Sequence, residues 1–129
     1  MNKHIVIIED DQEILDLLTE SLSRGGYRVT PLRHIRTFEE LIDLAPDAYI
    51  IDELLPVING HIICMILKSK PQTKNTPVLL ISGDHRLEHV ASLCEADDYL
   101  HKPFDAYHEL PERLRSLIGS TEIVNDGNA

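Results

Sequence analysis

The chain has 129 residues, a length that suits one compact domain. Apolar residues make up 43% of it, enough for a buried core, which argues against a wholly disordered chain. Its 12 Lys and Arg residues face 22 Asp and Glu residues, and the formal net charge of −10 would repel nucleic acid phosphates and anionic lipids. We therefore expect no direct binding to nucleic acid or to a membrane.

Two local features bear on where the protein works. The first apolar stretch, residues 5–8, is too short for a signal-peptide core or a membrane span. Cys64 and Cys94 each fall in a helical pattern without a Cys-x-x-Cys spacing, so we expect buried, reduced thiols rather than a disulfide or a metal site. These features favour a cytoplasmic protein. Met1 and the irregular last residues suggest a complete, stand-alone chain, and a domain excised from a longer protein is the alternative.

Short apolar runs alternate with helical patterns from the N-terminus onward. Residues 5–8 form a continuous apolar run, typical of a strand that is buried on both faces. Residues 11–24 carry apolar side chains at helical spacing and are followed by a Gly-Gly pair. A second strand is expected over 27–32. Pro31 indicates that this strand either lies at an edge of the sheet or ends at the proline, because proline cannot donate a hydrogen bond to a neighbouring strand.

The same alternation continues to residue 118. Thr37, followed three residues later by Glu40, is a capping-box pattern and predicts the start of the second helix. Pro111 falls in the last helical pattern, which should therefore begin near Leu110 or be kinked. The remaining strands and helices are expected, in chain order, at residues 48–51, 61–70, 78–81, 84–94, 99–100 and 110–118.

Five strand–helix units predict an α/β fold in which helices cover both faces of a parallel sheet. We expect the flavodoxin-like doubly wound arrangement, a five-stranded sheet in the order 2-1-3-4-5. The domain should comprise residues 1–119, since residues 120–129 lose the periodicity and are expected to form a flexible tail.

The ends of four expected strands carry polar residues that suit phosphate chemistry: Glu9, Asp10, Asp52, Ser82 and Lys102. The carboxyl ends of parallel strands meet at one edge of a sheet, so these side chains should converge. Neighbouring carboxylates repel each other unless a cation lies between them, and hard oxygen ligands favour Mg²⁺ or Ca²⁺. A lysine and a hydroxyl can hold phosphoryl oxygens, and a carboxylate nucleophile forms an acyl phosphate. Each residue alone is more often a cap, a turn or a solvated charge; the set predicts a phosphoryl-transfer site.

The chain resembles the receiver domains of two-component response regulators, the CheY-like superfamily, over about 115 residues from His4 to Ile118. The stretches that carry the resemblance are His-Ile-Val-Ile-Ile-Glu-Asp-Asp at 4–11, Tyr-Ile-Ile-Asp-Glu-Leu-Leu-Pro-Val-Ile-Asn-Gly at 49–60, Pro-Val-Leu-Leu-Ile-Ser-Gly at 77–83 and Ala-Asp-Asp-Tyr-Leu-His-Lys-Pro-Phe at 96–104. The resemblance implies a phosphoacceptor switch rather than an enzyme. It implies that a histidine kinase or a histidine phosphotransfer protein supplies the phosphoryl group.

The resemblance also implies roles at the metal site. Asp52 would accept the phosphoryl group and share in binding Mg²⁺ (or Mn²⁺). Asp10 would bind the metal directly, Glu9 largely through a metal-bound water, and Leu54 through its backbone carbonyl.

Further roles concern the switch. Ser82 would donate a hydrogen bond to one phosphoryl oxygen, and Lys102 would pair with another. Tyr99 matches an aromatic position that changes rotamer as Ser82 moves. The Lys102-Pro103 peptide bond would be cis.

Some positions depart from the family pattern. Glu95 stands where glycine is usual, so either the backbone there is strained or the turn differs. Leu54 and Asp84 occupy the positions that tune dephosphorylation, and Leu54 cannot orient water by hydrogen bonding. We therefore expect slow self-dephosphorylation. His85 and His89 lie four apart on an expected helix, a spacing that can bind a metal, although solvated histidines are the plainer reading.

Other readings stay open. Asp97, Asp98, Arg113 and Arg115 could support dimerisation through the last two helices, so a monomer or a weak phosphorylation-dependent dimer is expected. A phosphohydrolase of similar fold would need an acid two residues after the nucleophile, where this chain has Leu54. A non-phosphorylated interaction domain is the third alternative. The cognate kinase and the downstream protein partner are not specified by the sequence.

Overall fold

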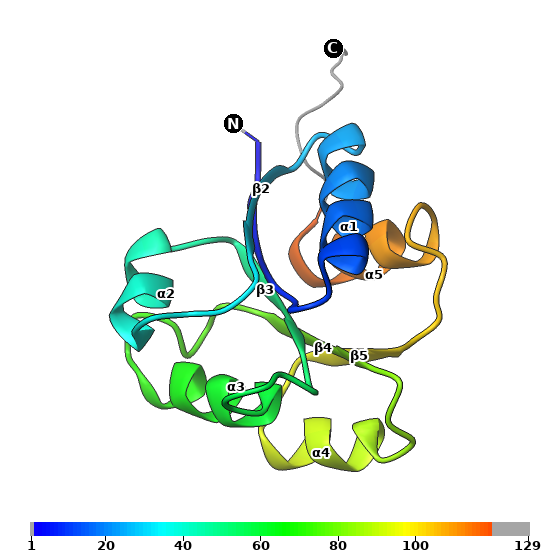
Figure 1. Cartoon of the computed structure of the whole chain (residues 1–129). Helices are drawn as coiled ribbons and strands as arrows, with labels where there is room; N and C mark the ends of the chain where they lie inside the picture. Colours follow the sequence, from blue (N-terminus) through cyan, green and yellow to red (C-terminus); the bar gives the residue numbers. More distant parts are fainter. Residues whose placement is uncertain (1, 120–129) are drawn as a thin grey trace.

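The computed structural model describes residues 2–119, which form five strands and five helices in strict alternation. In chain order these are β1 (His4–Ile8), α1 (Gln12–Arg24), β2 (Arg28–Leu32), α2 (Phe38–Leu44), β3 (Ala48–Asp52), α3 (Gly60–Ser69), β4 (Val78–Ser82), α4 (Leu87–Leu93), β5 (Asp98–His101) and α5 (Glu109–Ile118) (Figure 1). The expected tail at 120–129 lies outside the described residues.

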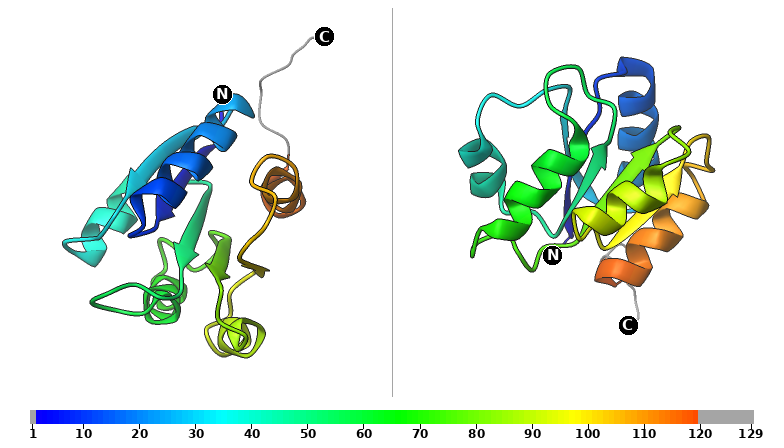
Figure 2. Two further views of the ribbon diagram at one scale, coloured as in Figure 1. Left: turned by 45° about the vertical axis from the view of Figure 1, so that its right-hand side comes forward. Right: turned by 90° about the horizontal axis from the view of Figure 1, so that it is seen from below.

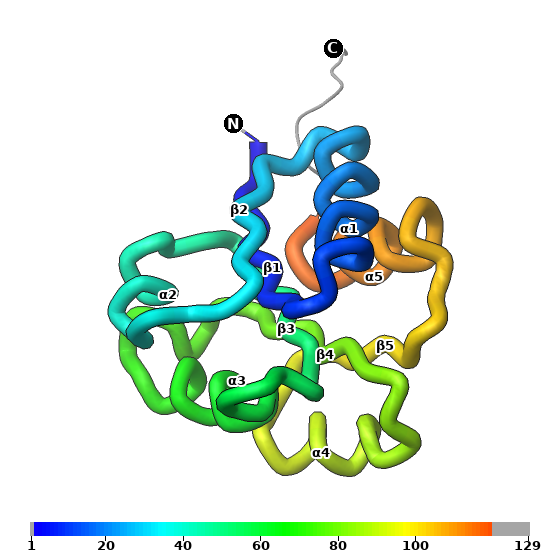
Figure 3. The backbone as a smooth tube through the Cα atoms, viewed as in Figure 1, coloured from blue at the N-terminus to red at the C-terminus, as the bar shows by residue number. Residues whose placement is uncertain are grey.

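All five strands pair in parallel in one sheet of order β2-β1-β3-β4-β5, which confirms the expected flavodoxin-like topology. The chain leaves β1, forms α1 and returns as β2 on one side of β1; it then crosses to β3 on the other side (Figure 3). The direction of winding therefore reverses between β1 and β3. In open sheets of this kind, sites form at the carboxyl ends of the strands beside such a reversal.

Two layers of helices bury the sheet. The core cluster on one face contains residues of α1 and α5, and the cluster on the other contains residues of α2, α3 and α4 (Figure 2). Every residue of β1, β3 and β4 is buried, as the continuous apolar runs predicted. β2 alternates between exposed and half-buried residues and lies at the sheet edge, where Pro31 had placed it. No helix in residues 2–119 is long and apolar enough to cross a membrane.

Helix starts agree with the sequence where a side chain caps them. The Asp11 carboxylate accepts hydrogen bonds from the N–H groups of Glu13 and Ile14, so α1 begins one residue later than expected. Thr37 caps α2 as predicted, accepting from the Glu40 N–H at 3.2 Å. α5 begins at Glu109 and holds Pro111 in its first turn, where proline fits.

The start of α4 was predicted wrongly. The Asp84 carboxylate accepts hydrogen bonds from the Arg86 N–H at 2.8 Å and from the Arg86 guanidinium at 3.0 Å. These bonds hold residues 84–86 as a turn, and the helix begins only at Leu87. His85 therefore lies outside the helix that carries His89, which removes the expected four-residue spacing on one helix. Glu95, after α4, has a φ of +62°, so the backbone there does adopt the left-handed conformation that favours glycine.

The loop between β3 and α3 closes tightly against the end of β3. A Cβ atom on Gly60 would lie 2.3 Å from the carbonyl oxygen of Asp52 and 2.9 Å from its carbonyl carbon. The Gly60 N–H donates to the Glu53 carbonyl at 2.9 Å. Only glycine permits this approach, and the approach fixes the backbone at Asp52.

We predict that Gly60→Ala destabilises the protein by about 2–4 kcal/mol, because a backbone carbonyl cannot move aside as a flexible side chain can. The matched control is Gly83→Ala, since nothing lies within 4 Å of the added Cβ there. The control should change the free energy of unfolding by less than about 0.5 kcal/mol. Urea unfolding followed by circular dichroism measures both. Equal effects of the two substitutions would contradict the close-approach argument.

Candidate functional site

The polar residues expected at the strand ends lie on one rim of the sheet. Glu9 and Asp10 follow β1, Asp52 ends β3, Ser82 ends β4 and Lys102 follows β5. The pairing registers Asp52↔Ile81 and Ser82↔His101 bring the ends of β3, β4 and β5 level with one another. The parallel sheet thus gathers residues that are up to 93 positions apart in sequence.

Three carboxylates form the centre of this rim. One oxygen from each of Glu9, Asp10 and Asp52 lies within 4.8 Å of the others. Glu9 is 1% exposed and Asp52 is 4% exposed, whereas Asp10 is half-buried. Within residues 2–119, no other three metal-binding side chains gather this closely. Clustered carboxylate oxygens are the donor set that Mg²⁺ and Mn²⁺ take in proteins, so these residues fit the expected metal.

Lys102 provides the positive charge beside the carboxylates. Its Nζ lies 2.7 Å from Glu9 Oε1 and 3.5 Å from Asp52 Oδ2. The Lys102-Pro103 peptide bond is cis, as the resemblance implied. One ammonium group against three carboxylates leaves the corner negative.

Asp52 shows the effect of this imbalance. Burial, together with the hydrogen bond and the negative charge of Glu9, raises the pKa of Asp52 to about 7, although Lys102 acts in the opposite direction. The Leu54 N–H, 3.4 Å from Asp52 Oδ1, also favours the ionised form. Without a further cation, Asp52 is therefore only partly ionised at neutral pH.

Ser82 and Tyr99, which the resemblance assigns to a switch, lie at different depths. Ser82 is fully buried, and its Oγ accepts a hydrogen bond from the Asp84 N–H at 3.1 Å. Tyr99 is half-buried on β5. Burial, followed by the negative charge of Glu88 on α4, raises the pKa of the Tyr99 phenol. Tyr99 therefore faces α4, so a change at its ring would be felt by that helix.

Leu54 and Asp84, which the resemblance expects to tune dephosphorylation, line one open hollow with Gly83, His85 and Arg86. Leu54 is 55% exposed and offers no hydrogen-bonding side chain. Asp84 is engaged with Arg86, whose hydrogen bonds lower the Asp84 pKa to about 2. Neither side chain is free to act as a base at neutral pH.

Two supporting contacts were missed by the sequence analysis. His61 donates through its backbone N–H to Glu53 Oε1 at 2.7 Å, and its Nδ1 lies 2.6 Å from Glu53 Oε2. This pair ties the residue after Asp52 to the first turn of α3. The Arg33 guanidinium donates to the carbonyl of Asp10 at 3.1 Å and 3.2 Å. A polar Glu53 at the end of an apolar strand was the available signal, but its partner eight residues away was not evident.

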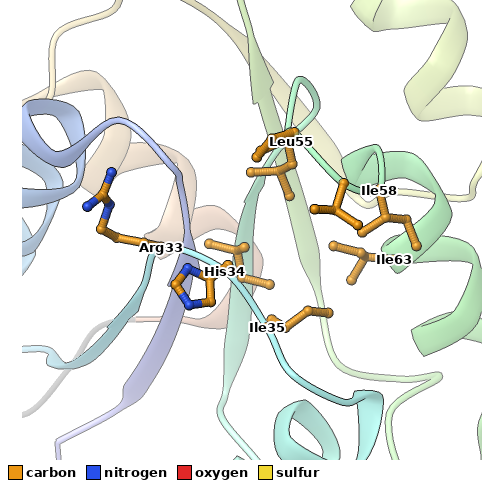
Figure 4. Close-up of a pocket in the computed structure, with 9 residues that line it drawn as sticks. Arg33, His34, Ile35, Leu55, Ile58 and Ile63 are labelled. Atoms are coloured by element: carbon orange, nitrogen blue, oxygen red, sulfur yellow. The ribbon is translucent and has the colours of Figure 1, made fainter.

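A separate apolar cavity of about 200 Å³ lies between the loop after β2 and the loop after β3. The side chains of Ile35, Leu55, Ile58 and Ile63 line it, and Arg33 and His34 stand at one edge (Figure 4). The residues that line the cavity include no carboxylate, unlike the rim.

The residues considered for dimerisation, and the two cysteines, lie away from the rim. Asp97 pairs with Lys68 at 2.7 Å, and Asp98 with Arg113 at 3.0 Å, so three of the residues considered for dimerisation form ion pairs within the chain. Cys64 and Cys94 are buried free thiols, as predicted.

Comparison with known proteins gives a consistent assignment. The family model described as "Response regulator receiver domain" matches residues 5–115. Response regulator MprA of Mycobacterium ulcerans is 35% identical over 130 residues, which cover 98% of this chain and 54% of the relative. The chain thus spans about half the length of the curated relatives it matches.

Solved structures with a similar fold support the same family assignment. A putative response regulator from Chloroflexus aurantiacus J-10-fl has a TM-score of 0.80 and 31% identity, covering 92% of this chain and 98% of its own. The receiver domain of a sensor histidine kinase from Pseudomonas aeruginosa PAO1 has a TM-score of 0.75 and 25% identity, covering 93% of this chain and 100% of its own. That second structure holds a magnesium ion coordinated in its active-site cleft.

The crowding of carboxylates makes a prediction for the metal-free protein. The Asp52 pKa is higher in the folded state, about 7, than its ordinary value of 3.8. Its stabilising contribution is therefore complete below about pH 4 and is lost as the pH rises toward 7. In EDTA, Asp52→Asn should become more stable than the unchanged protein by about 4 kcal/mol as the pH is raised from about 4 to about 8. Urea unfolding of both proteins at each pH measures the difference.

Asp105→Asn is the control with the opposite sign, because the hydrogen bond from His108 and those from nearby backbone N–H groups lower the Asp105 pKa. That variant should lose stability relative to the unchanged protein as the pH rises to about 4. A stability difference for Asp52→Asn that does not vary with pH would contradict the raised pKa of Asp52 in the folded protein.

Proposed function

The chain belongs to the family of response regulator receiver domains of two-component systems, and from this membership we propose that it is a phosphorylation switch with Asp52 as the acceptor. The observation that carries the proposal is the rim cluster, in which Glu9, Asp10, Asp52 and Lys102 meet at the carboxyl ends of three strands. The switch comprises residues 1–119 of the chain.

The proposed reaction forms one bond and breaks one. A carboxylate oxygen of Asp52 attacks the phosphorus of a phosphohistidine on a histidine kinase or a histidine phosphotransfer protein. The new P–O bond forms as the P–N bond breaks, and the imidazole leaves with the electron pair. With acetyl phosphate as donor, acetate leaves instead. The product is an aspartyl phosphate in both cases.

The residues around Asp52 suit this reaction. Mg²⁺, or Mn²⁺, held by Glu9, Asp10, Asp52 and the Leu54 carbonyl would neutralise the carboxylates and the incoming phosphoryl group. Lys102, 3.5 Å from Asp52 Oδ2, would pair with a second phosphoryl oxygen. Ser82 would donate a hydrogen bond from its hydroxyl group to a third. Phosphoryl transfer depends mainly on positioning and charge neutralisation, and this set of residues supplies both.

The response to phosphorylation would pass through Ser82 and Tyr99. Ser82 Oγ accepts from the Asp84 N–H, and a phosphoryl oxygen on Asp52 would attract the O–H of the same hydroxyl and draw Ser82 toward it. Tyr99 lies between β5 and α4 beside Glu88. A shift of Ser82 and Tyr99 would redistribute the populations of the surface formed by α4, β5 and α5, which a downstream protein would read.

The enzymatic alternative is disfavoured by one position. A phosphohydrolase would need an acid or base two residues after the nucleophile, and Leu54 supplies neither. We therefore propose a switch that phosphorylates from small donors and dephosphorylates itself, without turning over a separate substrate.

Intact mass spectrometry after incubation with Mg²⁺ and acetyl phosphate tests the proposed acceptor. We predict the addition of one phosphoryl group, which is lost in EDTA and in Asp52→Asn. Lys102→Ala should lower the phosphorylation rate by about tenfold or more, because the ammonium group no longer stabilises the developing charge. Asp105→Asn, an aspartate away from the rim, is the matched control and should be phosphorylated normally. Full phosphorylation of Asp52→Asn would disprove the assignment.

The lifetime of the aspartyl phosphate gives a separate prediction. An amide at position 54 could orient the attacking water by hydrogen bonding, so Leu54→Asn should shorten the lifetime by roughly tenfold. Val57→Asn makes the same kind of change on the same loop at a residue that is 93% exposed, and it should leave the lifetime unchanged. Decay is followed by intact mass after removal of the donor. Equal lifetimes in Leu54→Asn and the unchanged protein would show that Leu54 does not limit hydrolysis.

A further inference from the structure

The two cysteines of the chain, 30 positions apart, meet between two helices. Cys64 lies in the middle of α3, and Cys94 directly follows α4 as its C-cap residue. The Cys64 thiol donates to the Cys94 carbonyl at 3.3 Å, and both residues belong to the core cluster on that face of the sheet. A single buried cysteine is ordinarily a packing residue. Two thiols in contact across neighbouring helices can also react with each other.

The two thiols differ in acidity because they share a hydrogen bond. This bond raises the pKa of Cys64 and lowers that of Cys94 to about 7. The backbone N–H of Ala96 and the positive charge of His61 add to the lowering at Cys94, while burial opposes it. Cys94, and not Cys64, borders the surface hollow at the end of α4, so a reagent from solvent reaches Cys94 first, and the neighbouring Cys64 is placed to attack a sulfur bonded to it.

Access to the pair lies at the end of α4. Cys94 borders a surface hollow of about 190 Å³ together with Met65, Leu93 and Glu95. α4 is seven residues long, and no side chain caps its first turn. Glu95, directly after Cys94, holds a positive φ of 62°. α4 is thus short, has no side-chain cap at its N-terminus and is followed by a residue with a strained backbone. We expect such a helix to open locally at low free energy, which would admit a small reagent to Cys94.

We propose that Cys64 and Cys94 form a redox pair, which low-molecular-weight disulfides oxidise to an intramolecular disulfide that ties α3 to the end of α4. The Cys94 thiolate attacks one sulfur of the reagent, forming a mixed disulfide and releasing one thiol. Cys64 then gives up its proton as its sulfur attacks the Cys94 sulfur, and the second thiol is released. The protein loses two electrons and two protons, and the reagent disulfide is reduced to two thiols.

The bond would restrain the output surface. α4 carries Glu88, which lies beside Tyr99, and its far end would be fixed to α3, a helix that packs on β3. We infer that the oxidised protein responds less to phosphorylation than the reduced one. This regulatory part rests on the proposed switch, whereas formation of the disulfide does not.

The test uses oxidised glutathione as the reagent on the full chain. We predict a mass loss of two hydrogen atoms, reversal by dithiothreitol, and one cross-linked peptide pair joining residues 64 and 94. Cys64→Ala and Cys94→Ala, checked for folding by circular dichroism, should lose this product. Asp52→Asn should still form it, so that a failure of the phosphorylation proposal leaves the disulfide result unaffected. An unchanged mass, a stable glutathione adduct or cross-linked dimers would overturn the redox pair.

The regulatory part is read from NMR shifts induced by Mg²⁺ and beryllofluoride. Shifts at Leu87–Leu93 and Tyr99 should shrink by about half or more in the oxidised protein. The double variant Cys64→Ala/Cys94→Ala should respond equally with and without the oxidant. Equal shifts in the oxidised and reduced protein would disprove restraint of α4 while leaving the disulfide itself intact.

Discussion

Three carboxylates and one ammonium group share one corner of this protein, and the behaviour of the site follows from their burial and their unequal charge. Lys102 binds Glu9 at 2.7 Å and reaches Asp52 only at 3.5 Å. Burial, together with the hydrogen bond and the remaining negative charge of Glu9, raises the Asp52 pKa to about 7. A divalent cation would balance the negative charge of the carboxylates. A phosphoryl group on Asp52 would then give Lys102 a new partner.

The fold maintains this unfavourable grouping by rigid backbone support. β1, β3 and β4 are buried along their whole length, so the strand ends that carry the carboxylates have little freedom. Gly60 lets the loop after β3 approach the Asp52 carbonyl, and Glu53 fastens the start of that loop to His61. Strain and charge repulsion at functional sites persist only where the surroundings determine them in this way.

The sequence predicted the strand order, the helix layers and the meeting of Glu9, Asp10, Asp52, Ser82 and Lys102, because parallel strands place their ends on one edge whatever the details of packing. It did not predict where α4 begins, since the Asp84–Arg86 turn competes with the first helical turn. Tertiary contacts such as Glu53–His61 and Cys64–Cys94 were also missed, because no local periodicity encodes them. The chemical roles of the rim residues remain predictions.

The central claim is that Asp52 itself carries the phosphoryl group. Borohydride reduces an aspartyl phosphate to homoserine, which marks the acceptor permanently. Treatment of the phosphorylated protein with borohydride, followed by peptide mass spectrometry, should locate homoserine at position 52. Homoserine at position 10 or 84, or its absence from a protein that has gained a phosphoryl group, would contradict the account.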